Sequence, residues 1–307
     1  EIYLVLLALS TLVALAISLV LRAAAAAIDF PSENHSTPVR RRMLALFSLS
    51  LFWTLFAVVS TSTEEIARVF LLGAFIVCLG LGALLTGERG MISPRAQRTL
   101  PHTFLGRVFL TWLYPGAGLG YVFMVCMYAA LVGTLVFLDI YFGSRLQRMW
   151  GDSSMVATGY LLLCYLAIYL GANRLLLLLL PRHLPGRMVT SVALLTVLLV
   201  MSHLLPLFAV YFANDYRDFD YGWHQALNIP WSTQEVLDSG SLDSLSWDIG
   251  ATMVIVTLCA TAIFGLNLVL CTRDVMLVRV ALPPRIRQEI GLAQPIKPQP
   301  ADPFASD

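Results

Sequence analysis

The fold of this chain is decided by stretches such as MVATGYLLLCYLAIYLGANR, which occupies residues 155–174. This stretch contains a single charged side chain, the arginine at its end. A helix needs roughly 20 residues to cross a bilayer core of about 30 Å. Because lipid offers no partner to backbone N–H and C=O groups, only a helix or a closed barrel satisfies them there. Residues 155–174 therefore predict a transmembrane helix.

Six further apolar runs have the same character. They lie at residues 2–21, 43–60, 67–86, 116–139, 188–211 and 249–271. Hydrophobic residues make up 58% of the 307 residues and charged residues only 13%, whereas a soluble domain carries about 25% charged residues. We therefore predict an all-α, polytopic transmembrane helix bundle of about seven spans in residues 1–281. We expect the proline-rich tail, residues 282–307, to be disordered at its end.

Basic residues are unevenly divided between the segments that connect these runs. Connections 22–42, 87–115 and 174–187, with the tail from 272, hold sixteen of the twenty basic residues. Cytoplasmic segments of membrane proteins carry an excess of arginine and lysine. We therefore expect the amino end outside and the carboxyl end in the cytoplasm. The external loop 212–248 carries seven acidic residues and three tryptophans, and we interpret it as a cap lying on the membrane face.

The common signatures of catalysis and cofactor binding are missing from the sequence. The only lysine is Lys297, in the tail, so the phosphate-binding pattern G-x-x-x-x-G-K-[ST] is absent. No H-E-x-x-H, C-x-x-C or G-x-S-x-G occurs either. The five cysteines lie in or at the end of apolar runs and are interpreted as small apolar side chains. We expect no catalytic residue, metal, cofactor or enzyme activity in this chain.

Ionisable residues at the edges of the apolar runs are candidates for a function within the membrane. Asp139 ends the run 116–139, at the expected depth of the headgroups. Arg174 follows Asn173 and precedes six leucines. We interpret Arg174 as an arginine that reaches the inner interface, with Leu175–Leu180 forming a turn on the membrane surface. A role of Arg174 in a pore is the alternative.

Small residues predict close helix contacts and one bend. Ala74, Cys78 and Gly82 follow one another at four-residue spacing and predict a packing face, with a substrate groove as the alternative. The stretch Pro115–Gly120, PGAGLG, predicts that the chain bends or re-enters where the fourth run begins. A gating hinge and a static kink are both compatible with this composition.

The arginine-rich inner segments also contain apolar side chains that charge alone does not explain. Segments 22–42 and 87–115 each carry four arginines. A short amphipathic helix over residues 103–109 would place Phe104 and Val108 on one face, with Arg107 beside them. We interpret these three residues as a candidate docking site for a cytoplasmic ATPase. In the alternative interpretation, the arginines only contact anionic lipid.

Four short patches together resemble the membrane-spanning permease subunits of bacterial ABC exporters. FPSENHSTPVR, residues 30–40, resembles an E-N-R-S-T-x-x-R inner loop of that family, with His35 where arginine is usual. The other three patches are YPGAG at 114–118, LNIPW at 227–231 and PPRI at 283–286. The resemblance implies further helices upstream, so we expect the chain, which begins at Glu1, to be a carboxyl-terminal fragment.

The resemblance implies the permease component of an ATP-driven transporter in a bacterial inner membrane. Its partners would be the lipid bilayer, a cytoplasmic ATPase on a separate chain or domain, and a second permease in a homodimer or heterodimer. No nucleic-acid partner is expected. One alternative is a polytopic membrane enzyme acting on lipid or glycan, with Asp215, Asp218, Asp220 and His224 of the external loop as its site. Their spacing fits no metal signature, and a solvated acidic loop is favoured. The other alternative is a non-catalytic membrane assembly subunit.

Overall fold

Every regular element in the described part of the chain is helical. The computed structural model describes residues 2–28, 36–61, 64–88, 103, 111–150, 154–181, 186–213, 221–239 and 246–280. Its long helices are α1 (Ile2–Ile28), α2 (Ser36–Thr61), α3 (Glu64–Thr86), α6 (Ala117–Trp150), α7 (Ser154–Leu179), α8 (Arg187–Ala213) and α10 (Trp247–Val280). Short elements are the 3-10 turns η1 (Thr111–Leu113) and η2 (Trp223–Gln225) and the helix α9 (Ile229–Asp238).

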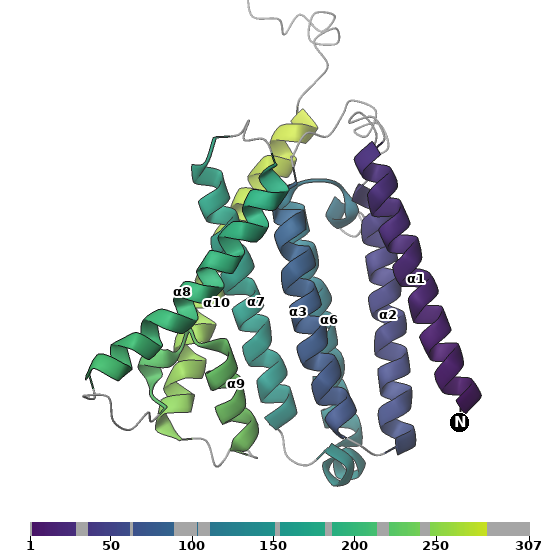
Figure 1. Cartoon of the computed structure of the whole chain (residues 1–307), viewed down its shortest axis with the longest axis vertical. Coiled ribbons are helices and arrows are strands. Elements are labelled where there is room, and N and C mark those ends of the chain that lie inside the picture. The colour runs from purple at the N-terminus through teal and green to yellow at the C-terminus, as the bar shows by residue number, and fades with distance from the viewer. Residues whose placement is uncertain are drawn as a thin grey trace, which may run out of the picture.

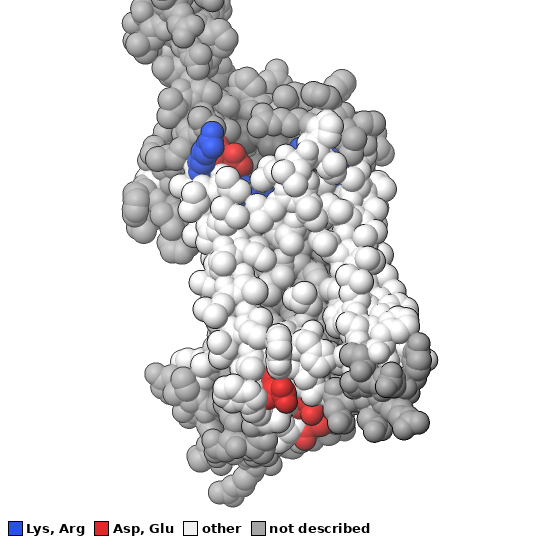
Figure 2. Space-filling model, turned by 90° about the vertical axis from the view of Figure 1, so that its left-hand side faces the viewer, with Lys and Arg blue, Asp and Glu red and all other residues white. Residues whose placement is uncertain are grey.

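The long helices coincide with the predicted apolar runs. Within the described residues, five of them are long and apolar enough to cross a bilayer, namely α3, α6, α7, α8 and α10. The qualifying apolar part of α1 is shorter, Ser10–Ala23. An uncharged band separates charged side chains at the two ends of the face in Figure 2. An all-α bundle is thus confirmed for the described residues, and its apolar helices indicate a membrane-embedded protein. A count of seven spans and the orientation stay predictions.

The long helices run side by side from one end of the bundle to the other (Figure 1). Helix α7 is central and packs against α3, α6, α8, α9 and α10, whereas α1 packs mainly on α2 at the edge of the bundle. We call the end that holds Arg40, Arg174 and Arg187 the arginine end; it is the upper end in Figure 1. The connection between α8 and α10, with η2 and α9, lies at the opposite end, which we call the cap end.

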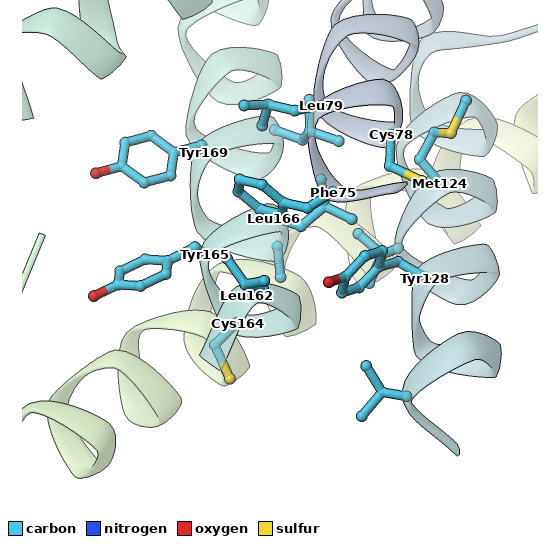
Figure 3. Packing of buried hydrophobic residues seen from close by; sticks show 14 of the residues in the cluster. Phe75, Cys78, Leu79, Met124, Tyr128, Leu162, Cys164, Tyr165, Leu166 and Tyr169 are labelled. Carbon is cyan, nitrogen blue, oxygen red and sulfur yellow. The ribbon is translucent and has the colours of Figure 1, made fainter. Parts of the chain in front are cut away.

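The core lies where α3, α6 and α7 meet (Figure 3). Phe75 and Tyr128 stack edge to face with ring centroids 6.1 Å apart. Ala74, Cys78 and Gly82 of the predicted packing face are all buried. A Cβ atom added at Gly82 would collide with the side chain of Leu170 on α7. Gly82 therefore lets α3 and α7 approach closely.

The helices extend beyond the predicted runs. Helix α6 continues past Asp139 to Trp150. Helix α7 continues through Leu179, so the turn expected at Leu175–Leu180 is wrong. Leucine is a strong helix former, and the first helix breaker after these leucines is Pro181. Much of the expected loop 22–42 is likewise helical, in the last turns of α1 and the first turns of α2.

Candidate functional site

The side chain of Arg40, in the second turn of α2, is completely buried and fixes the backbone ahead of α6. Its Nη1 donates to the carbonyl oxygens of Trp112 at 2.9 Å and Tyr114 at 2.6 Å. Its Nη2 donates to the Glu88 carboxylate at 2.5 Å and to the Gly116 carbonyl at 3.3 Å. One guanidinium therefore gathers three carbonyl groups from η1 and the turn that follows it.

Glu88 completes this arrangement from the end of α3. Its carboxylate also accepts hydrogen bonds from the Ser36 hydroxyl at 3.0 Å and the Gly116 N–H at 3.2 Å. An acidic side chain just after a helix C-terminus faces the negative end of the helix dipole, and the buried charge of Arg40 offsets this. The Arg40–Glu88 pair thus joins the start of α2, the end of α3 and the start of α6.

The turn between η1 and α6 has a backbone that requires glycine. Gly116 has φ of +145°, which an L side chain rarely adopts. Pro115 precedes it, and α6 begins at Ala117. Thr37 also donates to the Leu113 carbonyl at 2.9 Å. The bend predicted at Pro115–Gly120 is therefore a turn held from α2 by two side chains.

Arg174 is the second buried arginine at this end, with 1% of its side chain exposed. Its Nη1 donates to the Asn267 backbone carbonyl at 2.9 Å and to the Asn267 side-chain oxygen at 3.0 Å. Its Nη2 contacts the Asp274 carboxylate at 3.3 Å, and Asp274 itself is 65% exposed. The interpretation that Arg174 reaches the membrane interface is wrong, because oxygen acceptors on α10 replace water around its guanidinium.

Gly118 connects the two arginines. A Cβ atom there would lie 2.6 Å from Arg174 Nη2 and 3.1 Å from Cys271 Cβ. The Pro115–Gly118 turn therefore lies between the guanidinium of Arg40, which binds the Gly116 carbonyl, and that of Arg174, which packs on Gly118. We call Arg40, Glu88, Arg174 and this turn the arginine clamp.

A small polar network beside the clamp links three helices. Asn173 Nδ2 donates to Ser191 Oγ at 2.9 Å and to Thr86 Oγ1 at 3.2 Å. Ser191 Oγ donates in turn to the Ala83 carbonyl at 2.5 Å. These bonds hold α7, α8 and α3 together at the arginine end. Hydrogen bonds of this kind stabilise helix contacts where lipid offers no competing partner.

The cap end is fastened to α7 by tyrosines, whose rings project away from α3 and α6 (Figure 3). Tyr165 donates to the Ala226 carbonyl and Tyr169 to the Leu227 carbonyl, both at 2.6 Å. Asn228 caps α9 through its side-chain oxygen. Burial raises the pKa of Tyr221, against the effect of its hydrogen bonds to Ser232 and Thr252. The LNIPW patch is thus a helix start held on the bundle.

Several predicted site residues fall outside the described residues. These are Phe104, Arg107, Val108, Asp215, Asp218, Asp220 and the tail from 282. Asp139 belongs to α6, but its side chain is outside the described part. His224 is exposed in η2. The described residues contain no group of three or more His, Cys, Asp or Glu side chains placed to hold a metal ion.

Glu88 and Asn267 are among the residues of the site that were not predicted from the sequence. Glu88 is an acid directly after an apolar run and among arginines, a position at a helix C-terminus that calls for a compensating charge. Asn267 is the only side-chain amide in α10, and polar groups within a membrane span usually have a partner. Both signals are present in the sequence, but neither shows which residue Glu88 or Asn267 contacts.

The arginine clamp binds backbone and carboxylate oxygens of the chain itself, so it acts by fixing helices relative to one another. Through Arg40 and Glu88 it joins α2, α3 and α6, and through Arg174 it joins α7 and α10. Searches against protein-family models, curated proteins and solved structures found no match to this chain. The clamp and the sequence patches are therefore the basis for a functional assignment.

Proposed function

We propose that this chain is the membrane-spanning permease component of an ATP-driven transporter of the exporter type, with its ATPase on a separate chain or domain. The observation that carries the proposal is the arginine clamp. Ser36, Thr37 and Arg40 belong to the first patch that resembles exporter permeases, and Tyr114 and Gly116 belong to the second. The two patches are about 75 residues apart in sequence, and Arg40 of the first donates directly to the Tyr114 and Gly116 carbonyls of the second.

The clamp supports this proposal because it fastens both flanks of the segment that contains the candidate docking residues Phe104, Arg107 and Val108. Residues 89–110 begin directly after Glu88 and end directly before η1. Both flanks are bound to Arg40, through the Glu88 carboxylate and the Trp112 carbonyl. A force applied to this segment by an ATPase would reach α2, α3 and α6 together. Coupling between distant sites needs such a connection through rigid elements.

The ion pairs formed by Arg40 and by Arg174 differ in exposure, which suits a part that must move. In the Arg40–Glu88 pair only 0% and 12% of the two side chains are exposed. The Arg174–Asp274 contact is longer and its carboxylate is mostly in solvent, so it contributes little. In the proposed cycle, α2, α3 and α6 move as one unit, while the contact of Arg174 with Asp274 breaks and reforms.

Purification of the full-length protein from its own membrane tests the proposal. We expect an ATPase to co-purify, and membranes containing both proteins to hydrolyse ATP. The double substitution Phe104→Asp with Val108→Asp should release the ATPase while the protein still inserts normally. The control is Leu227→Asp, an apolar-to-acidic change at the exposed cap end, which should retain it.

Two results would count against the proposal at different levels. If the double variant retains the ATPase, residues 104–108 are not the docking element, and the transporter proposal stands without them. If native complexes contain no ATPase, the transporter proposal itself is wrong. Turnover of a lipid or glycan without any nucleotide would then favour the membrane enzyme.

A further inference from the structure

A long apolar groove runs between α1, α2 and α3. It has a volume of about 1030 Å³, at the upper end of the roughly 300–1,000 Å³ typical of ligand pockets. Its walls are almost entirely hydrocarbon, and its few polar members are Ser50, Trp53 and Thr54 on α2. Helix α1 forms one wall through Leu12, Val13, Ala16 and Leu19. The groove is therefore suited to a hydrocarbon ligand.

The dimensions of the groove fit an acyl chain. On α2 the lining extends from Met43 to Ala57, which at 1.5 Å per residue is about 21 Å along the helix. One leaflet contributes about half of a 30 Å hydrocarbon core. The groove is thus long enough to hold the acyl chain of a lipid from the leaflet at the arginine end.

The mouth of the groove at the arginine end is positively charged. Arg42 directly precedes the lining residue Met43 and lies one turn before Leu46 on the same face of α2. Arg22 follows the lining residue Leu19 by three positions, close to one turn of α1. Neither α1 nor α2 contains an acidic residue. Within the described part of the chain, no carboxylate forms an ion pair with either arginine.

We propose that this groove binds an anionic phospholipid, with an acyl chain between α1, α2 and α3 and the phosphate between Arg22 and Arg42. A phospholipid matches both features of the groove. Its hydrocarbon chain fits the apolar walls, and its anionic headgroup fits the arginines at the mouth. Basic pockets between transmembrane helices are known to bind acidic lipid headgroups. This proposal does not depend on the transporter proposal.

Trp53 provides a direct test because it lines the groove. A variant that keeps Trp53 and carries phenylalanine at the other five tryptophans is reconstituted into phosphatidylcholine vesicles. Phosphatidylglycerol or phosphatidylcholine with brominated acyl chains is then added as quencher. We expect brominated phosphatidylglycerol to quench Trp53 at a much lower mole fraction. The substitutions Arg22→Gln and Arg42→Gln together should weaken this preference roughly 30-fold, about fivefold for each arginine.

Matched variants distinguish the contribution of the headgroup contacts from that of the apolar groove. Arg273→Gln removes an exposed arginine of α10 and should leave the preference unchanged. Gly73→Leu should fill the groove, because a Cβ atom at Gly73 meets nothing within 4 Å. Gly265→Leu, on α10 and equally open, is its control.

Four results would overturn the proposal. The first is equal quenching by the two lipids, and the second is a preference that survives loss of Arg22 and Arg42. The third is quenching that Gly73→Leu does not reduce. The last is protection of Trp53 from both lipids, which would mean that a protein surface, such as a second copy of this chain, covers the groove.

Discussion

Arg40 and Arg41 are neighbours in the sequence with opposite surroundings. Arg40 is completely buried and makes four hydrogen bonds, whereas the side chain of Arg41 is exposed. Removing one member of a buried ion pair leaves an uncompensated charge, whereas an exposed charge is solvated by water whether or not it has a partner. The same chemical change should therefore have very different effects at these two positions.

We predict that Arg40→Gln lowers the free energy of unfolding by about 3–5 kcal/mol, because Glu88 stays buried without its partner. Arg41→Gln should change it by less than about 0.5 kcal/mol. Thermal unfolding of the purified proteins in the same detergent measures both. Adding Glu88→Gln to Arg40→Gln should recover part of the loss. Equal effects of Arg40→Gln and Arg41→Gln would show that the clamp does not stabilise the protein.

At the scale of the helix, two of the four glycines of α6 have different surroundings. Gly118 faces the Arg174 guanidinium and Cys271, whereas a Cβ atom at Gly133 meets nothing within 4 Å. Alanine replaces glycine favourably in a helix when space allows, by about 0.5–1 kcal/mol. Where space is lacking, an added methyl group costs about 1–3 kcal/mol.

We therefore predict opposite signs for the same substitution in one helix. Gly118→Ala should lower the melting temperature, because its methyl group displaces Arg174 or separates α6 from α10. Gly133→Ala should raise the melting temperature slightly. The measurement is thermal unfolding of both variants beside the parent protein. If Gly118→Ala is as stable as Gly133→Ala, the start of α6 does not pack against Arg174 as described.

The sequence predicted the elements well and the contacts between them poorly. Each long apolar run became a helix, because hydrophobic length is encoded locally. The ends were displaced where local charge and helix propensity disagreed: the arginines of 22–42 suggested a loop, yet much of that segment is helical. Residues of the first patch were singled out by resemblance, but their partner Glu88 lies 48 residues from Arg40. Such a pairing depends on how helices pack, which no local pattern contains.

Arg174 is a second residue whose contacts could not be predicted from its local sequence. An arginine at the end of an apolar run usually extends to the interface, since its charge is costly in hydrocarbon. Here Asn267 and Asp274 lie seven positions apart on one face of α10 and accept its hydrogen bonds. The acceptors come from 93 and 100 residues away. The prediction was wrong because it treated the residue without the neighbouring helix.

At the scale of the whole molecule, the uneven distribution of basic residues predicts which side of the membrane each connection occupies. Single cysteines at positions 95, 187 and 230, in a background without the native five, report which side each position occupies. In intact cells, an impermeant thiol reagent should label position 230, and it should reach 95 and 187 only after permeabilisation. Labelling at 95 from outside, with none at 230, would reverse the orientation.

The sequence distance within the clamp also sets an order of events during synthesis. The Gly116 carbonyl, the last acceptor of Arg40, is 76 residues downstream. At a ribosomal rate of about 5–20 residues per second, it emerges roughly 4–15 seconds after Arg40. Until Glu88, which lies 48 residues downstream, has also been synthesised, the guanidinium has only water or headgroups as partners, which disfavours its passage through the bilayer. This delay would therefore keep the start of α2 on the ribosome's side of the membrane until the native contacts of Arg40 form.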